Sequence, residues 1–357
     1  MSSEQDLQFQ NHILPLVSRT FALTIPQLPA GLDNVVSNAY LLCRIADTIE
    51  DDPVLDAQTK SNFLAGFLSV IAANEDSKDF STQLASRLSK HTRHTDRELV
   101  KNTTTVVRNL ARFTSTQRNA VIRCVTTMCK SMPEFQDGKT LEGLPELTDL
   151  DRYCYFVAGI VGEMLTDLFC EHCPELEKQR DEMMALSVSF GQGLQMTNIL
   201  KDIWEDRDAN TCWLPSNLFH DLEGGLSRAM RDRNSTAMSA GVEKLVGIAH
   251  AHLRAALLYT QLIPRQEVGI RRFCLWAIGM AMLTLRRIHK NPGYNNGGAV
   301  KISRRAVRAT VITCNIAQYS NYTVSLLFAL VSRGMPLAND GEYCPPSGTR
   351  LASDRQV

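Results

Sequence analysis

The sequence has no excess of charge of either sign, no late apolar run long enough for a membrane span and no apolar segment at its start. Lys+Arg and Asp+Glu both number 38 in 357 residues, which argues against a basic nucleic-acid-binding surface. The longest late apolar run, 324–331, is too short to cross a bilayer. Residues 1–10 are polar, so we expect no secretory signal and a cytoplasmic protein, peripherally membrane-associated at most.

A second pair of cysteines to complete a metal site is also missing. The ten cysteines include one CxxC, Cys170–Cys173, but no other pair lies at the spacing of a zinc ribbon or finger. A thioredoxin-like site would need a βαβ context, which the sequence does not supply. We therefore expect reduced, mostly buried thiols. A metal or redox protein built on this CxxC is the weaker alternative, and bound zinc or a titratable disulfide would indicate it.

The alternation of apolar and polar residues that is typical of β-strands is absent, and the apolar period is helical almost throughout. Proline and glycine separate the periodic segments. With 44% hydrophobic and 21% charged residues, the chain has ordinary globular composition. We predict an all-α single domain over 1–333 and a flexible tail over 334–357. The predicted helices cover 31–50, 57–73, 95–130, 148–171, 177–208, 235–262, 266–289 and 303–332.

What the sequence does contain is a pair of acidic clusters of the same layout, far apart in the chain. Each has carboxylates at i, i+3 and i+4, which places them on one face of a helix. Such oxygen ligands favour Mg²⁺, or Mn²⁺, over zinc or copper, and two rows facing each other would hold several ions around a diphosphate. The alternative is a pair of solvated acidic helix faces. The carboxylates are Asp47, Glu50 and Asp51 in the first cluster and Asp202, Glu205 and Asp206 in the second.

Other polar residues continue each acidic row along its helix. Tyr40 and Arg44 precede Asp47 at helical spacing, and Gln195 and Asn198 precede the second cluster in the same way. Arg44 could form a structural ion pair with Asp47, or its guanidinium could bind a phosphate beside the metal site. Buried amides at positions 195 and 198 would need partners, which a diphosphate or a metal-bound water would supply.

A third segment, 153–162, is apolar and holds two glycines three residues apart. Because glycine inside a helix costs about 1 kcal/mol relative to alanine, Gly159 and Gly162 indicate the close approach of another helix or of a ligand chain. Tyr153 begins this segment. Its phenol is either a buried hydrogen-bonding group that stabilises the fold or a group that handles a proton near a carbocation.

Four ordered motifs resemble the squalene and phytoene synthase family. The resemblance runs from about residue 18 to 304, which is most of the chain. It implies the isoprenoid synthase fold, a helical domain around a central cavity, and the head-to-head (1′–1) condensation of two prenyl diphosphates. The matching segments are Ser18–Phe21, Arg44–Asp52, Tyr153–Gly159 and Gln195–Asp206.

The same resemblance implies a role for each matching residue. The implied Mg²⁺ ligands are Asp47, Asp51, Asp202 and Asp206, assisted by Glu50 and Glu205. The implied diphosphate contacts are Ser18, Arg19 and Arg44, with Gln195 and Asn198 lining the same pocket. Tyr153 would transfer a proton in the first half-reaction, and Phe273 would shield the cation in the second. Tyr40 is a further pocket-lining match.

The implied substrate is two molecules of farnesyl diphosphate, and the last step decides the product. Hydride delivery from NADPH gives squalene, whereas proton loss gives a dehydro product, as in dehydrosqualene or phytoene synthases. Residues 294–304 resemble the segment linked to NADPH, in which Asn296, Lys301 and Arg304 would hold the cofactor. A solvated basic loop is the alternative. Because no G-x-G-x-x-G follows a strand, NADPH binding would not be Rossmann-like. The length of the chain favours squalene.

Two features depart from the family pattern. Members usually have Gly-Arg before the aromatic-Leu-Pro that follows the second cluster, but residues 207–215 have no arginine at that place, and Arg207 is the candidate substitute. Eukaryotic members end in a membrane anchor, which this sequence lacks. We therefore expect a bacterial-type enzyme, a monomer or weak oligomer, that meets the membrane only peripherally to hand over its product.

Two other protein classes share an acidic helical fold. A class I terpene cyclase would mix Asn, Ser or Thr with Glu in its second motif, so the pairing of Asp202 with Asp206 argues against it. A non-catalytic assembly factor of the same fold would be expected to lose some carboxylates, and all are present here. Product analysis separates these classes from a head-to-head synthase.

Overall fold

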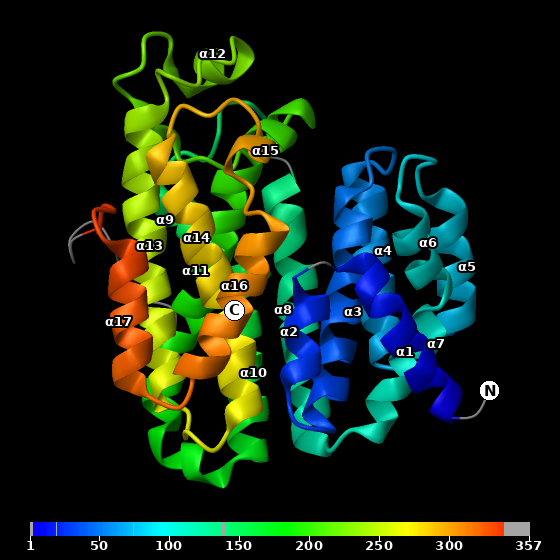
Figure 1. The fold of residues 1–357 in the computed structure, drawn as a ribbon. Coiled ribbons are helices and arrows are strands. Elements are labelled where there is room, and N and C mark those ends of the chain that lie inside the picture. Colours follow the sequence, from blue (N-terminus) through cyan, green and yellow to red (C-terminus); the bar gives the residue numbers. More distant parts are fainter. Residues whose placement is uncertain (1–2, 19, 74, 137–139, 339–357) are drawn as a thin grey trace. The chain divides into compact units, whose positions relative to one another are not determined.

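The computed structural model describes residues 3–18, 20–73, 75–136 and 140–338, and these residues form helices and their connections (Figure 1). Within these ranges no β-strand forms, and the backbone pairing outside helices is an isolated bridge between Leu144 and Pro215. The all-α prediction is therefore confirmed. The chain divides into two compact units, residues 1–137 with 167–174 and residues 138–166 with 175–357.

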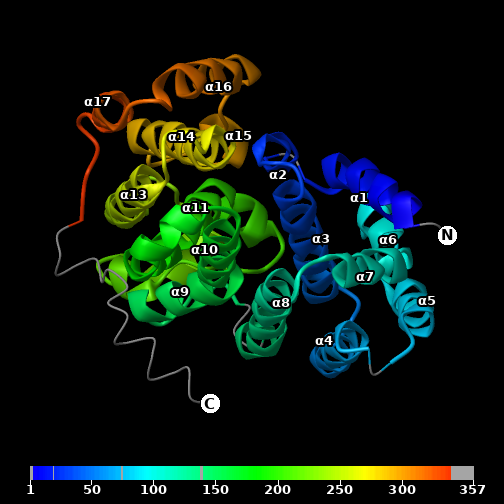
Figure 2. The same ribbon diagram turned by 90° about the horizontal axis from the view of Figure 1, so that it is seen from below.

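In the first unit, α3 is the central helix and contacts α1, α4, α6, α7 and α8 (Figure 2). One side of α3 is apolar, and Leu41, Leu42, Ile45 and Ile49 are fully buried. This burial fixes the rotation of α3 and hence the direction of its acidic row. The helices are α1 Ser3–Val17, α2 Phe21–Thr24, α3 Leu32–Asp51, α4 Ala57–Ile71, α5 Ser77–Arg87, α6 His94–Lys101, α7 Thr103–Asn109 and α8 Ser115–Gln136.

In the second unit, α11 is the long central helix and contacts α9, α13, α14 and α15. Met196, Ile199 and Ile203 are buried on its apolar side. The helices are α9 Leu147–Cys154, α10 Ile160–His172, α11 Arg180–Asp208, α12 Gly225–Arg231, α13 Ser239–Leu262, α14 Val268–Lys290, α15 Gly297–Val300, α16 Arg304–Ala317 and α17 Asn321–Ser332. A π-helical segment, Tyr155–Gly159, joins α9 to α10, whose last residues belong to the first unit.

The glycines of the 153–162 segment serve helix packing. A Cβ atom on Gly162 would lie 2.0 Å from the carbonyl oxygen of Ser187 on α11, and one on Gly191 would lie 2.1 Å from that of Ala158. Two backbones can approach so closely only where no side chain intervenes. The structure thus supports the helix-packing interpretation of Gly162, and the contacts at Ala158 and Gly162 hold the later part of this segment against α11.

A buried arginine ties the last helices of the second unit together. Arg271 on α14 is fully buried, and its guanidinium donates to the carbonyl oxygens of Thr260 and Ile263 at the end of α13, at 3.1 and 2.7 Å. It also donates to the carbonyl oxygen of Gln318 and to Oδ1 of Asn321, both at 2.7 Å, in the turn between α16 and α17. Because all these partners are acceptors, the charge is well solvated by the protein.

Two helical stretches, Leu147–His172 and Val268–Lys290, are long and apolar enough to span a bilayer. In each, 72% of the most apolar window is buried inside the fold, as in the core helix of a soluble protein. The single-domain boundary at residue 333 stays a prediction. Of the expected tail, residues 334–338 are described, and Ala338 N donates to the carbonyl oxygen of Gly247 on α13 at 3.2 Å. The rest of the tail lies outside the described residues.

Candidate active site

The first acidic row stands at the C-terminal end of α3, and its carboxylates have different environments. Glu50 is buried, Asp47 is half-buried and Asp51 is exposed. Asp52, the next residue, accepts four hydrogen bonds, two of them from Ser89 N and Thr92 Oγ1 at 2.7 Å. These bonds outweigh the effect of burial and hold the pKa of Asp52 below its usual range. Asp52 therefore fastens the end of α3.

The surroundings of Asp47 disfavour a negative charge on its side chain. Burial, followed by the like charge of Asp51, raises the pKa of Asp47 to about 8, although Arg44 acts in the opposite direction. A carboxylate in that state binds a proton or a metal cation. A divalent cation between Asp47 and Asp51 would remove their repulsion, so these residues fit the predicted Mg²⁺.

Arg44 does not use its guanidinium on Asp47. It forms a bidentate pair of hydrogen bonds with Asp96 of α6, with Nε 3.1 Å from Oδ1 and Nη2 3.0 Å from Oδ2. Arg93 binds the same carboxylate in the same bidentate way, at 2.7 and 3.1 Å. Burial raises the pKa of Asp96, but the two arginines outweigh it and keep the pKa low. Two guanidinium groups share one carboxylate, so the cluster keeps a net positive charge one turn from Asp47, which is suited to a phosphate.

Tyr40 and Ser18 lie together, as the prediction of a shared pocket requires. The Tyr40 hydroxyl donates to the carbonyl oxygen of Val17 at 3.3 Å and interacts with the Ser18 side chain, and its ring centroid is 5.3 Å from that of Phe21. Ser18 Oγ also accepts from Phe21 N at 3.1 Å, which fixes the start of α2. Arg19, the other predicted diphosphate contact on this segment, lies outside the described residues.

The second acidic row stands at the C-terminal end of α11 and is more open. Asp202 and Asp206 are half-buried, and Glu205 is exposed. Lys201 Nζ lies 3.0 Å from Asp202 Oδ2 and donates to Asn198 Oδ1 at 3.1 Å. The expectation of a buried amide at Asn198 is wrong, since this side chain is exposed and lysine is its partner; Gln195 is half-buried. The row projects from the surface because only the opposite side of α11 is apolar.

The segment predicted to bind NADPH is fixed directly onto the second acidic helix. Tyr294 donates its hydroxyl to the carbonyl oxygen of Leu200, and Trp204 Nε1 donates to the carbonyl oxygen of Tyr294 at 2.7 Å. A Cβ atom on Gly297 would lie 2.5 Å from Oε1 of Glu205, so the carboxylate rests against bare backbone. The segment and the acidic row thus form one local structure, which the sequence alone did not indicate.

The three predicted cofactor residues differ in their local roles. The Asn296 carboxamide oxygen caps α15 by accepting from Ala299 N at 3.1 Å. Lys301 and Arg304 are exposed at the start of α16, where Ser303 caps the helix by accepting from Ala306 N at 3.2 Å. A helix N-terminus beside two cations suits a phosphate group, so Lys301 and Arg304 fit the phosphates of NADPH.

Arg207 has a structural role in this arrangement. Its guanidinium donates to the carbonyl oxygens of Met230 and Arg231, in the last turn of α12, at 3.0 and 2.8 Å. It also lies 3.0 Å from Asp208. These bonds occupy the group that was predicted to replace the missing diphosphate arginine, and they do not favour that role.

Tyr153 is buried and stacks on an aromatic ring of residues 207–215, the stretch that lacks the usual Gly-Arg of the family. Its ring centroid is 4.0 Å from that of Trp213, with the planes 10° apart. Phe273 is also buried, on α14. Aromatic faces such as these stabilise a nearby cation. The stacking partner Trp213 was not identified from the sequence, because it lies 60 residues away along the chain.

A buried polar group beside this helix was also missed. Oδ1 of Asp151 is buried and has no hydrogen-bond partner among the described residues, and burial raises the pKa of Asp151 to about 7. His252 Nε2 on α13 is 3.9 Å from that oxygen, and its Nδ1 is 3.2 Å from Ser189 Oγ. Burial lowers the pKa of His252 to about 3, so the imidazole is neutral at neutral pH. Spacing along the chain gives no signal of this cluster, since three helices supply it.

Neither acidic row is a complete metal site by itself. Among the described residues, no three Asp, Glu, His or Cys side chains are grouped as metal ligands. Mg²⁺ commonly keeps several water ligands and binds through one or two carboxylates plus substrate phosphates, so a row of this kind suits a metal–diphosphate complex better than a stably bound structural ion. Cys170 and Cys173 are buried, as expected of core thiols.

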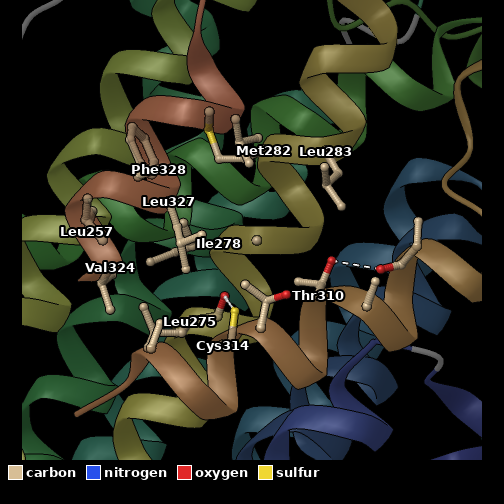
Figure 3. Close-up of a pocket in the computed structure, with 16 residues that line it drawn as sticks. Leu257, Leu275, Ile278, Met282, Leu283, Thr310, Cys314, Val324, Leu327 and Phe328 are labelled. Carbon is tan, nitrogen blue, oxygen red and sulfur yellow. Dashed lines mark hydrogen bonds between the residues drawn. The ribbon is translucent and has the colours of Figure 1, made fainter. Parts of the chain in front are cut away.

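A separate apolar cavity of about 400 Å³ lies in the second unit between α13, α14, α16 and α17 (Figure 3). None of the predicted site residues lines it. Its polar groups are satisfied locally, since Thr310 Oγ1 donates to the carbonyl oxygen of Ala306 at 2.9 Å and Cys314 Sγ to that of Leu275 at 3.5 Å. The lining is otherwise aliphatic and aromatic, as for Ile278, Met282 and Phe328.

Comparison with known sequences gives one family. The model described as squalene/phytoene synthase matches residues 14–306. A squalene synthase of Gibberella zeae is 28% identical over 338 residues, covering 94% of this chain and 69% of the relative. Those of Schizosaccharomyces pombe and Botryococcus braunii are also 28% identical, covering 81% and 89% of this chain. The chain spans 61% and 67% of the length of these two relatives.

Solved structures share the fold. A complex of TcSQS with the ligand BPH1237 has a TM-score of 0.76 at 23% identity and covers 94% of each chain. A dehydrosqualene synthase in complex with a ligand has a TM-score of 0.63 at 20% identity, covering 88% of this chain and 96% of the other. The predicted isoprenoid synthase fold is therefore confirmed.

Proposed function

The chain belongs to the squalene/phytoene synthase family, and we propose that it is a squalene synthase that joins two farnesyl diphosphates head to head and reduces the product with NADPH. The observation that carries this proposal is the pair of carboxylate rows, each at the C-terminal end of the central helix of its unit. Relatives named squalene synthase are 28% identical to the chain, which supports the same reaction type.

Ionisation of the allylic diphosphate is the first task of the site. Bound Mg²⁺ supplies charge that stabilises the leaving diphosphate, and NADPH supplies the hydride of the second half-reaction. Asp47 and Asp51 on one helix and Asp202 and Asp206 on the other would hold the metal. Arg44, oriented by Asp96, adds fixed positive charge for the diphosphate oxygens.

The fate of the allylic cation depends on residues that exclude water. Tyr153, stacked on Trp213, and Phe273 are buried, so their rings offer a dry aromatic surface to the cation. Attack by the double bond of the second farnesyl chain, with loss of a proton, gives a cyclopropylcarbinyl diphosphate. Tyr153 is proposed to handle that proton. Departure of the second diphosphate, rearrangement and hydride transfer then give the linear product.

The alternative within the family is a dehydrosqualene or phytoene synthase, which lacks the reductive step. The position of residues 294–304 favours the reductive enzyme. Tyr294 and Gly297 hold this segment on the second acidic helix. Lys301 follows α15, Arg304 begins α16, and both side chains are exposed. A coenzyme whose phosphates bind there would lie close to the metal row.

Product analysis tests the proposal. The purified chain is incubated with farnesyl diphosphate and Mg²⁺, with and without NADPH, and the products are identified by mass spectrometry. Squalene with NADPH, and the cyclopropyl diphosphate or dehydrosqualene without it, is the expected result. The same dehydro product under both conditions supports the alternative, and the absence of any head-to-head product contradicts both. In addition, Lys301→Gln should raise the KM for NADPH while leaving formation of the cyclopropyl intermediate unchanged, with Lys290→Gln as the matched control.

A further inference from the structure

The late part of the chain combines many basic residues with a complete lack of acidic ones. Between residues 268 and 339 the sequence has ten Lys and Arg residues and no Asp or Glu, although the whole chain has 38 of each kind. Arg305 and Arg308 on α16 are exposed. No residue that the structure describes gives either of them a hydrogen bond or an ion pair. This region therefore carries a positive field that the protein does not neutralise locally.

Exposed apolar side chains gather on the same two helices. Of the eleven large hydrophobic residues that are exposed in the described part of the chain, six lie on α16, on α17 or in the turn between them. Their exposed fractions run from 47% for Leu326 to 78% for Tyr322. Scattered apolar residues on a surface are ordinary, but a contiguous group indicates a binding surface. The six are Ile312, Ile316, Tyr319, Tyr322, Leu326 and Leu330.

The exposed residues occupy the outer sides of both helices. The inner sides face the apolar cavity through Thr310 and Cys314 on α16 and through Leu327 and Phe328 on α17 (Figure 3). Within the second unit, α16 and α17 form an outside layer over α13 and α14 (Figure 2). Arg271 holds the turn between them. The pair is thus a helical hairpin that is anchored at its turn and apolar on both sides, a property that packing inside a soluble protein does not require.

From this combination we infer that the outer surface of the α16–α17 hairpin binds an anionic phospholipid bilayer. Interfacial helices place apolar side chains among the acyl chains and cations near the lipid phosphates, and tyrosine is favoured at that depth. Ile316, Leu326 and Tyr322 supply the first contact, and Arg305 and Arg308 supply the second. A second copy of the chain would bring two positive surfaces together, so charge favours the bilayer over self-association.

Flotation of the full chain with vesicles tests this inference without an activity measurement. Vesicles of phosphatidylcholine are compared with vesicles that also contain phosphatidylserine. The chain should float with the anionic vesicles at low ionic strength and be released by salt, because salt screens the attraction. Each arginine near an anionic surface contributes about a fivefold factor in binding, so Arg305→Gln with Arg308→Gln should weaken partitioning by about twenty-five-fold.

A matched pair of variants tests whether binding depends on the α16 surface in particular or only on the net charge of the protein. Arg180→Gln with Arg228→Gln removes the same charge where acidic neighbours Glu177 and Asp232 lie close. This control pair should change partitioning much less than the α16 pair. Equal effects of the two pairs would overturn the inference.

The apolar contribution has its own pair of variants. Ile316→Ser with Tyr322→Ser should weaken binding by about tenfold, since both side chains are more than two-thirds exposed and their loss does not disturb the core. Leu16→Ser, on α1, is the control and should leave binding unchanged. Circular dichroism establishes that all variants are folded. Absence of flotation with anionic vesicles, or a stable dimer that the α16–α17 variants dissociate, contradicts the assignment to a bilayer.

Discussion

The two acidic helices present the same spacing of carboxylates in opposite surroundings. On α3, Asp47 is desolvated beside Asp51, and the neighbouring cation Arg44 is held by a buried partner, Asp96. On α11, the row is more open, and the half-buried pair Lys201–Asp202 is the local ion pair. The difference shows that the spacing of a motif fixes which way its carboxylates point from the helix. The packing around the helix determines whether those carboxylates are ionised and how much free energy their burial requires.

The largest expected effect tests whether the two rows act together. Under the proposed function, Asp51→Asn and Asp206→Asn should each lower kcat by about a hundredfold to a thousandfold, since each would remove a ligand charge that holds the metal beside the leaving diphosphate. The helical circular dichroism should be unchanged. Steady-state kinetics with farnesyl diphosphate measures the effect. Substantial activity in one variant and none in the other would break the equivalence of the rows.

The partners of the two cations should differ in their contribution to stability. Asp96→Ala leaves Arg44 partly buried without its carboxylate, so the free energy of unfolding should fall by about 3 kcal/mol. Lys201→Gln, the counterpart on α11, should change it by less than about 1 kcal/mol, because solvent reaches both members of that pair and neither is fully buried as Asp96 is. Urea denaturation compares the two variants. Similar losses would show that the local packing does not distinguish the rows.

In the absence of metal, the first row should destabilise the protein as the pH rises. The pKa of Asp47 is about 8 in the folded protein and about 4 in an unfolded chain. Its contribution to stability is therefore fully present below pH 4 and is lost as the pH rises to 8. With a chelator at pH 8, Asp47→Asn should raise the free energy of unfolding by about 1–3 kcal/mol, with no gain at pH 4. Asp202→Asn is the control and should stay within about 1 kcal/mol.

The smallest effect concerns the contact between the second row and the cofactor segment. Gly297→Ala places a methyl group against the carboxylate of Glu205, which must move, so unfolding free energy should fall by about 1–2 kcal/mol. Gly298→Ala meets only the side chain of Asn296, at 3.0 Å, and should cost less. Thermal denaturation distinguishes the two. Equal stability of both variants would show that Glu205 is free to leave its position.

Much of the fold could be predicted because apolar periodicity is strong in the core helices. The predicted helix 31–50 agrees with α3, and 177–208 and 266–289 agree with α11 and α14 within a few residues. Helices with little apolar face, α5 among them, were not predicted. The predicted helix 95–130 is interrupted at Asn102, whose side chain donates to the carbonyl oxygen of Glu98 at 2.9 Å. Such local side-chain bonds end a helix without changing the apolar period.

In the candidate site, features set by local spacing could be predicted, whereas contacts between residues far apart in the chain could not. The carboxylate rows follow from spacing alone, and both lie on the expected helices. The pairing of Arg44 with Asp96 cannot be predicted from spacing, because Asp96 is 52 positions away and Asp47 is a nearer candidate partner. The docking of Tyr294 onto α11 joins residues 94 positions apart. Contacts of this kind are set by tertiary packing, which no single-sequence pattern encodes.

The π-helical segment Tyr155–Gly159 has a consequence for the geometry of the site. It adds one residue to the turn between Tyr153 and the glycine contact with α11. Because each residue of an α-helix turns the chain by about 100°, deleting one residue there would restore the regular pitch and rotate everything before it. The glycine would keep its neighbour while Tyr153 swung away from Trp213. The extra residue of the π-helical segment therefore sets the direction of the Tyr153 side chain without changing how the glycine contacts α11.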